Sequence, residues 1–205
     1  MLTWLQFGDL HASDADGWDS LDIFSRLVDE VNRHLLDAVD FAVLPGDNAN
    51  HATEDQFRRI GEIASRLRLP LHILPGDHDF EAGSLKDFNG ILGGRQLPYA
   101  LNYRDTRCLF LDLVSAGSGG PDFRLGDQHR QWLTIELDAA AARTERPVIF
   151  MHAYPTDLKA GGDDIADLYS RSHVAFAAAG IPQVITSDPI ERIIQTYQWL
   201  REIDD

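Results

Sequence analysis

The residues best suited to chemistry in this sequence are aspartates and histidines that directly follow four short apolar runs. Two of these runs end in the same tetrapeptide, Leu-Pro-Gly-Asp, and a third ends in the triplet Asp-Leu-His. Carboxylate and imidazole groups bind hard or borderline divalent cations such as Mn, Fe and Zn. The pattern therefore predicts a metal site built from separate segments of the chain. Its expected ligands are Asp9, His11, Asp47, Asp77 and His152.

Such ligands converge only if regular elements bring the runs to one edge. Asp47 and Asp77 lie 30 positions apart, and a strand–helix–strand unit takes about 30 residues. The spacing fits two neighbouring parallel strands, with each aspartate just past a carboxyl end, where open α/β sheets bind ligands. The glycines that precede the two aspartates, Gly46 and Gly76, would let backbone and carboxylate approach closely.

The remaining periodicity predicts an α/β protein. A helix is expected from Asp19 or Ser20, as its cap, to about Ala38, and a second helix is expected after a Thr53 cap. Beyond a loop with a short helix at residues 80–94, antiparallel strands are expected at 100–103 and 107–113. A further helix is expected to open at residue 126.

Composition narrows the class of protein. The chain has 205 residues, 44% of them hydrophobic, which suits one globular domain. The net charge of −15, without a basic cluster, argues against duplex nucleic acid as a partner. No apolar stretch approaches the roughly 20 residues of a membrane helix. A first strand at about Leu2 leaves no room for a signal peptide, and the single Cys108 suits a buried thiol, so we expect a cytoplasmic protein.

The predicted ligands suggest a dinuclear centre. Asp9 and His11 would hold one ion, Asp77 and His152 a second, and Asp47 would bridge two ions about 3.5–4 Å apart. Such a pair binds a phosphate and generates hydroxide near neutral pH. The remaining site residues are expected to act on the substrate: Asn48 and His78 by contact, His78 also as a proton source, and Asp79 by orienting His78.

These motifs make the chain resemble the calcineurin-like metallophosphoesterases, in particular the bacterial branch with cyclic-nucleotide phosphodiesterase-like enzymes. The matching segments are residues 9–11, 46–48 and 76–79, with the lone His152, in a stretch of about residues 2–180. The resemblance implies two packed mixed β-sheets flanked by helices and two divalent metal ions. It also implies hydrolysis of phosphomonoesters or phosphodiesters, with a small-molecule phosphate ester as substrate.

Two departures from the family pattern affect what the resemblance implies. Asp77 replaces the asparagine of the usual Gly-Asn-His, which should tighten cation binding and weaken attraction for phosphate. The family's closing Gly-His-x-His is missing, since no histidine follows His173. We therefore expect a metallophosphoesterase domain at residues 1–180, incomplete in its second sheet, and a divergent tail at residues 181–205.

The tail has its own predictions. From Ser187 it is typical of an amphipathic helix, which could support a homodimer. A shifted reading frame across the codons of residues 180–182 would restore a histidine, so the tail is also interpreted as a frameshifted end. Two alternatives to an active enzyme remain: a catalytically impaired metal- or nucleotide-binding module of the same fold, and a purely structural α/β domain.

Overall fold

The computed structural model describes residues 2–114 and 126–152. The chain divides into one compact unit at residues 1–157 and a second at residues 158–205, which lies outside the described residues. The expected domain boundary at residue 180, the tail helix and His173 also fall outside them and stay predictions. Among the described residues, no helix is long and apolar enough to cross a bilayer.

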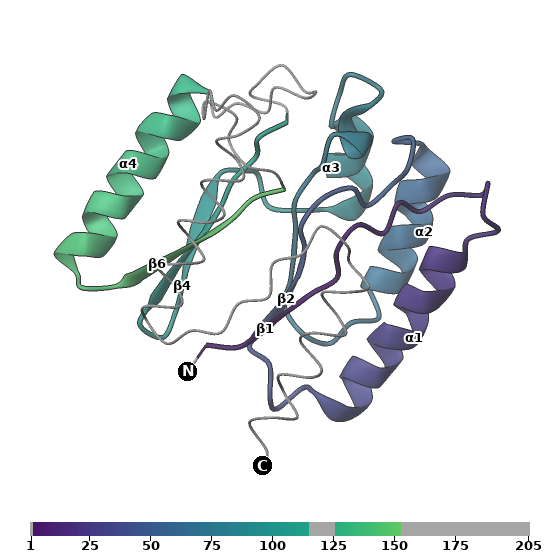
Figure 1. Ribbon diagram of the computed structural model, residues 1–205, viewed down its shortest axis with the longest axis horizontal. Helices are drawn as coiled ribbons and strands as arrows, with labels where there is room; N and C mark the ends of the chain where they lie inside the picture. Colours follow the sequence, from purple (N-terminus) through teal and green to yellow (C-terminus); the bar gives the residue numbers. More distant parts are fainter. Residues whose placement is uncertain (1, 115–125, 153–205) are drawn as a thin grey trace, which may run out of the picture. The chain divides into compact units, whose positions relative to one another are not determined.

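The first sheet contains the predicted strand–helix–strand repeat. Strands β1 (Trp4–Gln6), β2 (Phe41–Leu44) and β3 (Leu71–Ile73) lie in the order β1-β2-β3, and both neighbouring pairs are parallel. Helix α1 (Asp19–His34) joins β1 to β2, and α2 (Glu54–Ala64) joins β2 to β3. The two helices pack side by side, as Figure 1 shows. The spacing of the two Leu-Pro-Gly-Asp segments therefore predicted this half of the fold correctly.

The second sheet is mixed. Strands β4 (Tyr99–Tyr103) and β5 (Thr106–Phe110) are antiparallel, whereas β6 (Arg146–Phe150) runs parallel to β5. A 3-10 turn, η1 (His78–Phe80), and helix α3 (Lys86–Leu92) lead into it, and α4 (Asp127–Ala142) packs on β5 and β6 (Figure 1). The α/β architecture with two sheets and flanking helices is confirmed, although the described strands of the first sheet are parallel rather than mixed.

The two sheets share a buried aromatic core. Phe41 of β2 lies edge-to-face with Phe110 of β5 and Phe150 of β6, whose rings stack at 4.9 Å. Cys108 belongs to this core, and burial raises the pKa of its thiol to about 11. The prediction of an unreactive core thiol is confirmed. A second cluster on the opposite face of the first sheet holds α1, α2 and α3 against it.

Of the two predicted helix caps, one is confirmed and one is wrong. Thr53 caps α2 as predicted, and in the structure it forms a capping box with Gln56. The cap of α1 is Trp18, in a left-handed conformation without a side-chain bond, so the predicted Asp19 or Ser20 cap was wrong. Helix α1 also ends at His34 rather than near Ala38, because the backbone leaves helical geometry at Leu35.

Candidate metal centre

The loops that follow β1 and β2 run side by side. The amide of His11 donates to the carbonyl of Asp47 at 2.9 Å, and the amide of Ala12 donates to that of Asn48 at 3.0 Å. In the opposite direction, the amide of Asn50 donates a hydrogen bond to the carbonyl of Ala12 at 3.1 Å. This short parallel ladder extends the sheet edge and holds the Asp-Leu-His segment against the first Gly-Asp segment.

Three of the predicted ligands have an unusual backbone. Asp9, His11 and Asp47 adopt φ values of 49°, 41° and 51°. The left-handed region is sparsely populated by residues other than glycine, and such conformations persist only where the surroundings impose them. Here the ladder between the two loops supplies that constraint. The three residues with these strained conformations all contribute atoms to the groups that meet at the sheet edge.

Asp47 lies between two histidines. Its Oδ2 is 3.5 Å from Nε2 of His11, and its Oδ1 is 3.4 Å from Nε2 of His152. The amide of His78 donates to the same Oδ1 at 3.2 Å. The two oxygens of a single carboxylate thus face different imidazoles, which is the geometry that a bridging ligand requires.

The potential ligand atoms form two overlapping groups. In one, Asp9, Asp47 and His152 offer atoms within 4.8 Å of one another; in the other, His11, Asp47 and His78 do. Asp77 is in neither group, although its Oδ1 lies 3.3 Å from Nε2 of His152. The structure therefore brings all five predicted ligands to one edge of the first sheet, with His78 beside them.

Two glycines make this convergence possible. A Cβ at Gly46 would lie 2.3 Å from Nδ1 of His152, and one at Gly76 would lie 2.1 Å from Oδ1 of Asp47. Real Cβ atoms do not approach other atoms this closely, so any larger residue would displace a candidate ligand. The two Leu-Pro-Gly-Asp segments thus carry glycine because a neighbouring ligand occupies the space of its missing side chain.

The charges of these groups favour cation binding. Burial tends to raise the pKa of Asp47, but the hydrogen bond from His152 and the charges of His152 and His11 hold it below its ordinary value. Burial tends to lower the pKa of His152, yet Asp47 and Asp77 raise it to about 9. The carboxylates of Asp47 and Asp77, which raise the pKa of His152, are the groups that would attract a cation to the same place.

His78 is oriented by a backbone carbonyl. Its Nδ1 bonds the carbonyl oxygen of Asn50 at 2.8 Å, which leaves Nε2 free of that contact. The carbonyl raises the pKa of His78, with further contributions from Asp47 and Asp77 that offset partial burial. Asp79 was predicted to orient this imidazole, and that prediction was wrong. The sequence offered no sign of the Asn50 carbonyl, because every residue has one.

Asp79 has a different position. It is fully buried, and its carboxylate accepts four N–H groups, from the amides of Asn48, Ala49 and Gly76 and the side chain of Asn48. Burial raises the pKa of Asp79, and these donors oppose the rise. We call Asp79 and Asn48 the buried brace, because they join the loop after β2 to the loop after β3.

The prediction that Asn48 contacts substrate also needs correction. Its side chain is fully buried and donates to the carbonyl of Leu74 at 2.9 Å and to Asp79 at 2.8 Å. A side chain without exposure cannot touch a ligand in solvent. Within the described part of the chain, its Oδ1 has no hydrogen-bond partner. Asn48 and Asp79 therefore position the site rather than take part in its chemistry.

The donor set fits divalent cations. Carboxylate oxygens and imidazole nitrogens meet within a few ångströms, which suits ions such as Mn, Fe and Zn. Asp47 directs one oxygen toward His11 and the other toward His152. Candidate ligands occupy the space that side chains at Gly46 and Gly76 would need. The described residues thus contain enough oxygen and nitrogen donors for two neighbouring ions.

Comparison with known proteins agrees with this geometry. The family model "Calcineurin-like phosphoesterase" matches residues 2–187. The chain is 29% identical over 158 residues to the glycerophosphodiester phosphodiesterase GpdQ of Enterobacter lignolyticus (strain SCF1), covering 74% of this chain and 51% of that protein. It thus spans about half the length of this curated relative.

A solved structure shares the fold. A dimetal phosphatase from Danio rerio superimposes with a TM-score of 0.58 at 17% identity, covering 74% of this chain and 69% of that one. At this identity the likeness concerns the fold alone. Because the family model covers most of the sequence, including every candidate ligand at the sheet edge, the chain belongs to the calcineurin-like phosphoesterase family.

Proposed function

We propose that the protein is a metal-dependent phosphoesterase that hydrolyses phosphomonoesters or phosphodiesters. The observation that carries this proposal is the position of Asp47, whose two oxygens face His11 on one side and His152 on the other. A carboxylate so placed suits two ions that share a ligand, and a phosphate ester is the substrate that such a pair activates.

Each candidate ligand has a proposed role. Following the order of the motifs, Asp9, His11 and Asp47 would hold one ion, and Asp47, Asp77 and His152 the other. Asp9 also lies close enough to His152 to share the second ion. Bound divalent cations would supply a hydroxide nucleophile near neutral pH and stabilise the negative charge of the phosphoryl group. Mn, Fe and Zn suit these donors.

His78 is proposed to act on the substrate. Its Nδ1 is bonded to the carbonyl of Asn50, so Nε2 is the nitrogen that a phosphoryl oxygen or a leaving group would meet. The raised pKa of His78 favours the imidazolium, which can donate a hydrogen bond or a proton. His78 therefore remains the proposed catalytic residue, whereas Asp79 acts only through the buried brace.

The substrate is proposed to be a small-molecule phosphate ester. The name of the relative GpdQ, a glycerophosphodiester phosphodiesterase, supports a phosphodiester among the choices. The charge of −15 opposes binding of a polyanion such as duplex nucleic acid. A compact ester with one or two negative charges suits this balance better.

A second candidate is a metal- or nucleotide-binding module that has lost turnover. The observation in its favour is that residues 174–205 contain neither a Gly-His-x-His motif nor a histidine. Loss of partners that only orient metal ligands already costs about 10–100-fold in affinity or activity. The two candidates differ in turnover and agree in cation binding.

The deciding experiment measures both properties on the full chain. Calorimetry with Mn²⁺ gives the stoichiometry and affinity, and bis(4-nitrophenyl) phosphate with added Mn²⁺ gives the rate. For the enzyme we expect turnover that EDTA abolishes and that Asp47→Asn lowers by at least about 100-fold. Asp138→Asn, at an exposed position on α4, is the matched control and should leave both values unchanged.

Two results would separate the candidates or reject both. Mn²⁺ binding with no turnover would identify the binding module. A parent chain that binds no Mn²⁺, or an Asp47→Asn variant that binds it as tightly as the parent, would remove the metal centre itself.

A further inference from the structure

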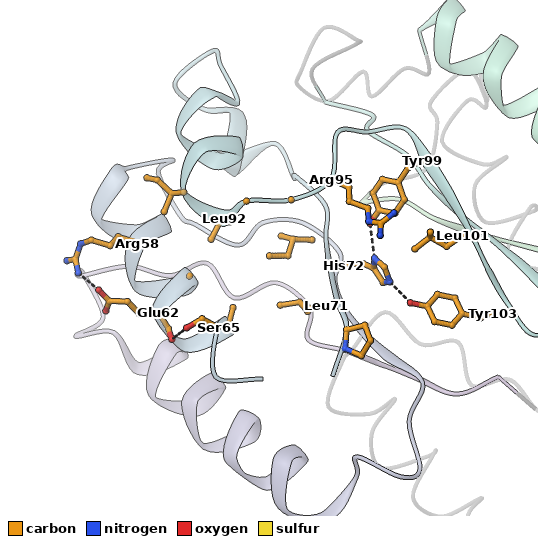
Figure 2. A pocket seen from close by; sticks show the side chains of 17 residues that line it. Arg58, Glu62, Ser65, Leu71, His72, Leu92, Arg95, Tyr99, Leu101 and Tyr103 are labelled. Carbon is orange, nitrogen blue, oxygen red and sulfur yellow. Dashed lines mark hydrogen bonds and ion pairs between the residues drawn. The ribbon is translucent and has the colours of Figure 1, made fainter. Parts of the chain in front are cut away.

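A cleft opens at the edge of the two sheets, on a different part of the fold from the predicted ligands. It lies between β3 and β4 and is bordered by α2 and the segment after α3 (Figure 2). Its volume is about 790 Å³, within the 300–1,000 Å³ that small-molecule sites span. None of the predicted metal ligands lines it.

One wall of the cleft is apolar. Leu71 and Ile73 from β3, Leu92 at the end of α3 and Leu101 of β4 all line it. Leu71, Leu92 and Leu101 are only partly buried. Covering such surface removes apolar area from water, which favours binding of a ligand with a hydrocarbon or aryl body.

Arg95 supplies a positive charge on the same cleft. It lies over the ring of Tyr99, with its guanidinium carbon 5.7 Å from the ring centroid. Among the described residues it has no ion pair or hydrogen bond, whereas Arg58, which also lines the cleft, is paired with Asp55 and Glu62. The donors of Arg95 are thus available to an oxyanion, and the aromatic ring holds the guanidinium in place.

Figure 2 shows a second polar group beside Arg95. His72 is buried, and its ring nitrogens lie 2.9 Å from the hydroxyls of Tyr99 and Tyr103. Burial, together with the charge of Arg95, lowers the pKa of His72 to about 4, so the ring is neutral at physiological pH.

A neutral imidazole donates through one nitrogen and accepts through the other. One tyrosine therefore donates its hydroxyl proton to His72. The other accepts the proton of His72 and retains its own O–H as a donor. The arrangement thus leaves one phenolic O–H without a fixed acceptor in the cluster, and both tyrosines line the cleft together with Arg95.

We propose that this cleft is a second ligand site, which binds a small organic oxyanion with an apolar or aryl body. The oxyanion would accept hydrogen bonds from Arg95 and from the free hydroxyl of the tyrosine pair. The apolar or aryl body of the ligand would cover Leu71, Leu92 and Leu101. The proposal does not depend on the metal centre, so it stands or falls separately from the phosphoesterase assignment.

The probe is 8-anilinonaphthalene-1-sulfonate, an aryl oxyanion whose fluorescence rises on binding, titrated into the full chain with Mn²⁺ present. We expect saturable binding that Arg95→Gln weakens by about 10-fold, the loss typical of a charge-assisted hydrogen bond. Arg68→Gln is the matched control, since Arg68 is exposed and does not line the cleft. Arg95→Lys should keep much of the affinity because the charge remains.

Two further measurements locate the probe. The uncharged N-phenyl-1-naphthylamine should bind the parent and Arg95→Gln equally, because it lacks the oxyanion. Amide shifts in NMR spectra should concentrate at residues 71–73 and 93–95 when the sulfonate is added. An Arg95→Gln affinity within twofold of the parent, an equal loss in Arg68→Gln, or shifts confined to other residues would overturn the proposal.

Discussion

Asp47 is the residue on which the candidate metal centre depends most directly. It contacts His11 and His152 through different oxygens and accepts a hydrogen bond from the amide of His78. Its left-handed backbone and the absence of a side chain at Gly76 both serve this position. A change at the neighbouring glycine should therefore affect the site as strongly as a change of a ligand.

The substitution Gly76→Ala tests this dependence. The new methyl group would start 2.1 Å from Oδ1 of Asp47, so the carboxylate must move. We expect the affinity for Mn²⁺, measured by calorimetry, to fall by at least about 10-fold. Gly90→Ala is the control, because its methyl group meets nothing within 4 Å and it lies inside α3, where alanine stabilises by about 0.5–1 kcal/mol. Equal Mn²⁺ affinity in Gly76→Ala and the parent would contradict the expectation.

Asp77 provides a second test at the scale of the residue. Its carboxylate adds a negative charge 3.3 Å from Nε2 of His152, where the family has a neutral asparagine. Asp77→Asn should weaken Mn²⁺ binding and raise the rate on bis(4-nitrophenyl) phosphate at saturating Mn²⁺, since less negative charge opposes the substrate. Both values come from the assays above. Identical rates for the variant and the parent would remove the hypothesis.

At the scale of elements, the buried brace joins two strand ends. Asp79 lies in η1, which follows β3. Its carboxylate accepts hydrogen bonds from the amides of Asn48 and Ala49 after β2 and from the amide of Gly76 after β3. The brace thereby sets the relative position of the two Gly-Asp segments. Its contribution should appear in stability and in metal affinity together.

The substitution Asp79→Asn measures the brace. The amide has one acceptor oxygen and an NH₂ group that would face N–H donors, so buried donors lose their partner. We expect the free energy of unfolding in urea to fall by about 3 kcal/mol. Asp87→Asn, at an exposed position on α3, should change it by less than about 0.5 kcal/mol. A brace variant as stable as the parent would show that the four bonds contribute nothing net.

At the scale of the whole described unit, His72 lies where the two sheets meet. Its ring is 4.4 Å from that of Phe110 and bonds Tyr99 and Tyr103 of β4. Burial keeps it neutral with a pKa of about 4, below the 6.5 of an unconstrained histidine. The packing of the two sheets therefore depends on an uncharged imidazole.

This packing predicts a pH dependence of stability. Between pH 6.5 and pH 4 the unfolded chain binds the proton of His72 and the folded chain does not, so stability rises with pH. The contribution is complete above pH 6.5 and is lost as the pH falls toward 4. Between pH 7 and pH 4.5 the loss should be about 2–3 kcal/mol, measured by urea unfolding at each pH.

Variants isolate this contribution from other titrating groups. Over the same pH interval, the unfolding free energy of His72→Phe should decrease by about 2–3 kcal/mol less than that of the parent. Gln131→Ala, at an exposed position on α4 without a titrating group, should keep the slope of the parent. A His72→Phe variant with the parent slope would mean that His72 is protonated equally in both states.

Local spacing and residue type were enough to predict several features of this protein. The 30-residue separation of Asp47 and Asp77 predicted the parallel β2–β3 unit, and the ends of four apolar runs predicted which side chains meet at one edge. Thr53 predicted the start of α2. These features depend on neighbours in the chain or on the repeat of one supersecondary unit, so a pattern of residue types is enough to indicate them.

The positions of groups whose partners are distant in sequence could be read only from the folded molecule. Asp79 follows His78 directly, which suggested that it orients that imidazole, yet its partners are mostly amides about 30 residues earlier in the chain. Asn48 is buried by the same contacts, and His72 finds its tyrosines on the other sheet. The direction and burial of a side chain follow from how the sheets pack, and adjacency along the chain carries no record of that packing.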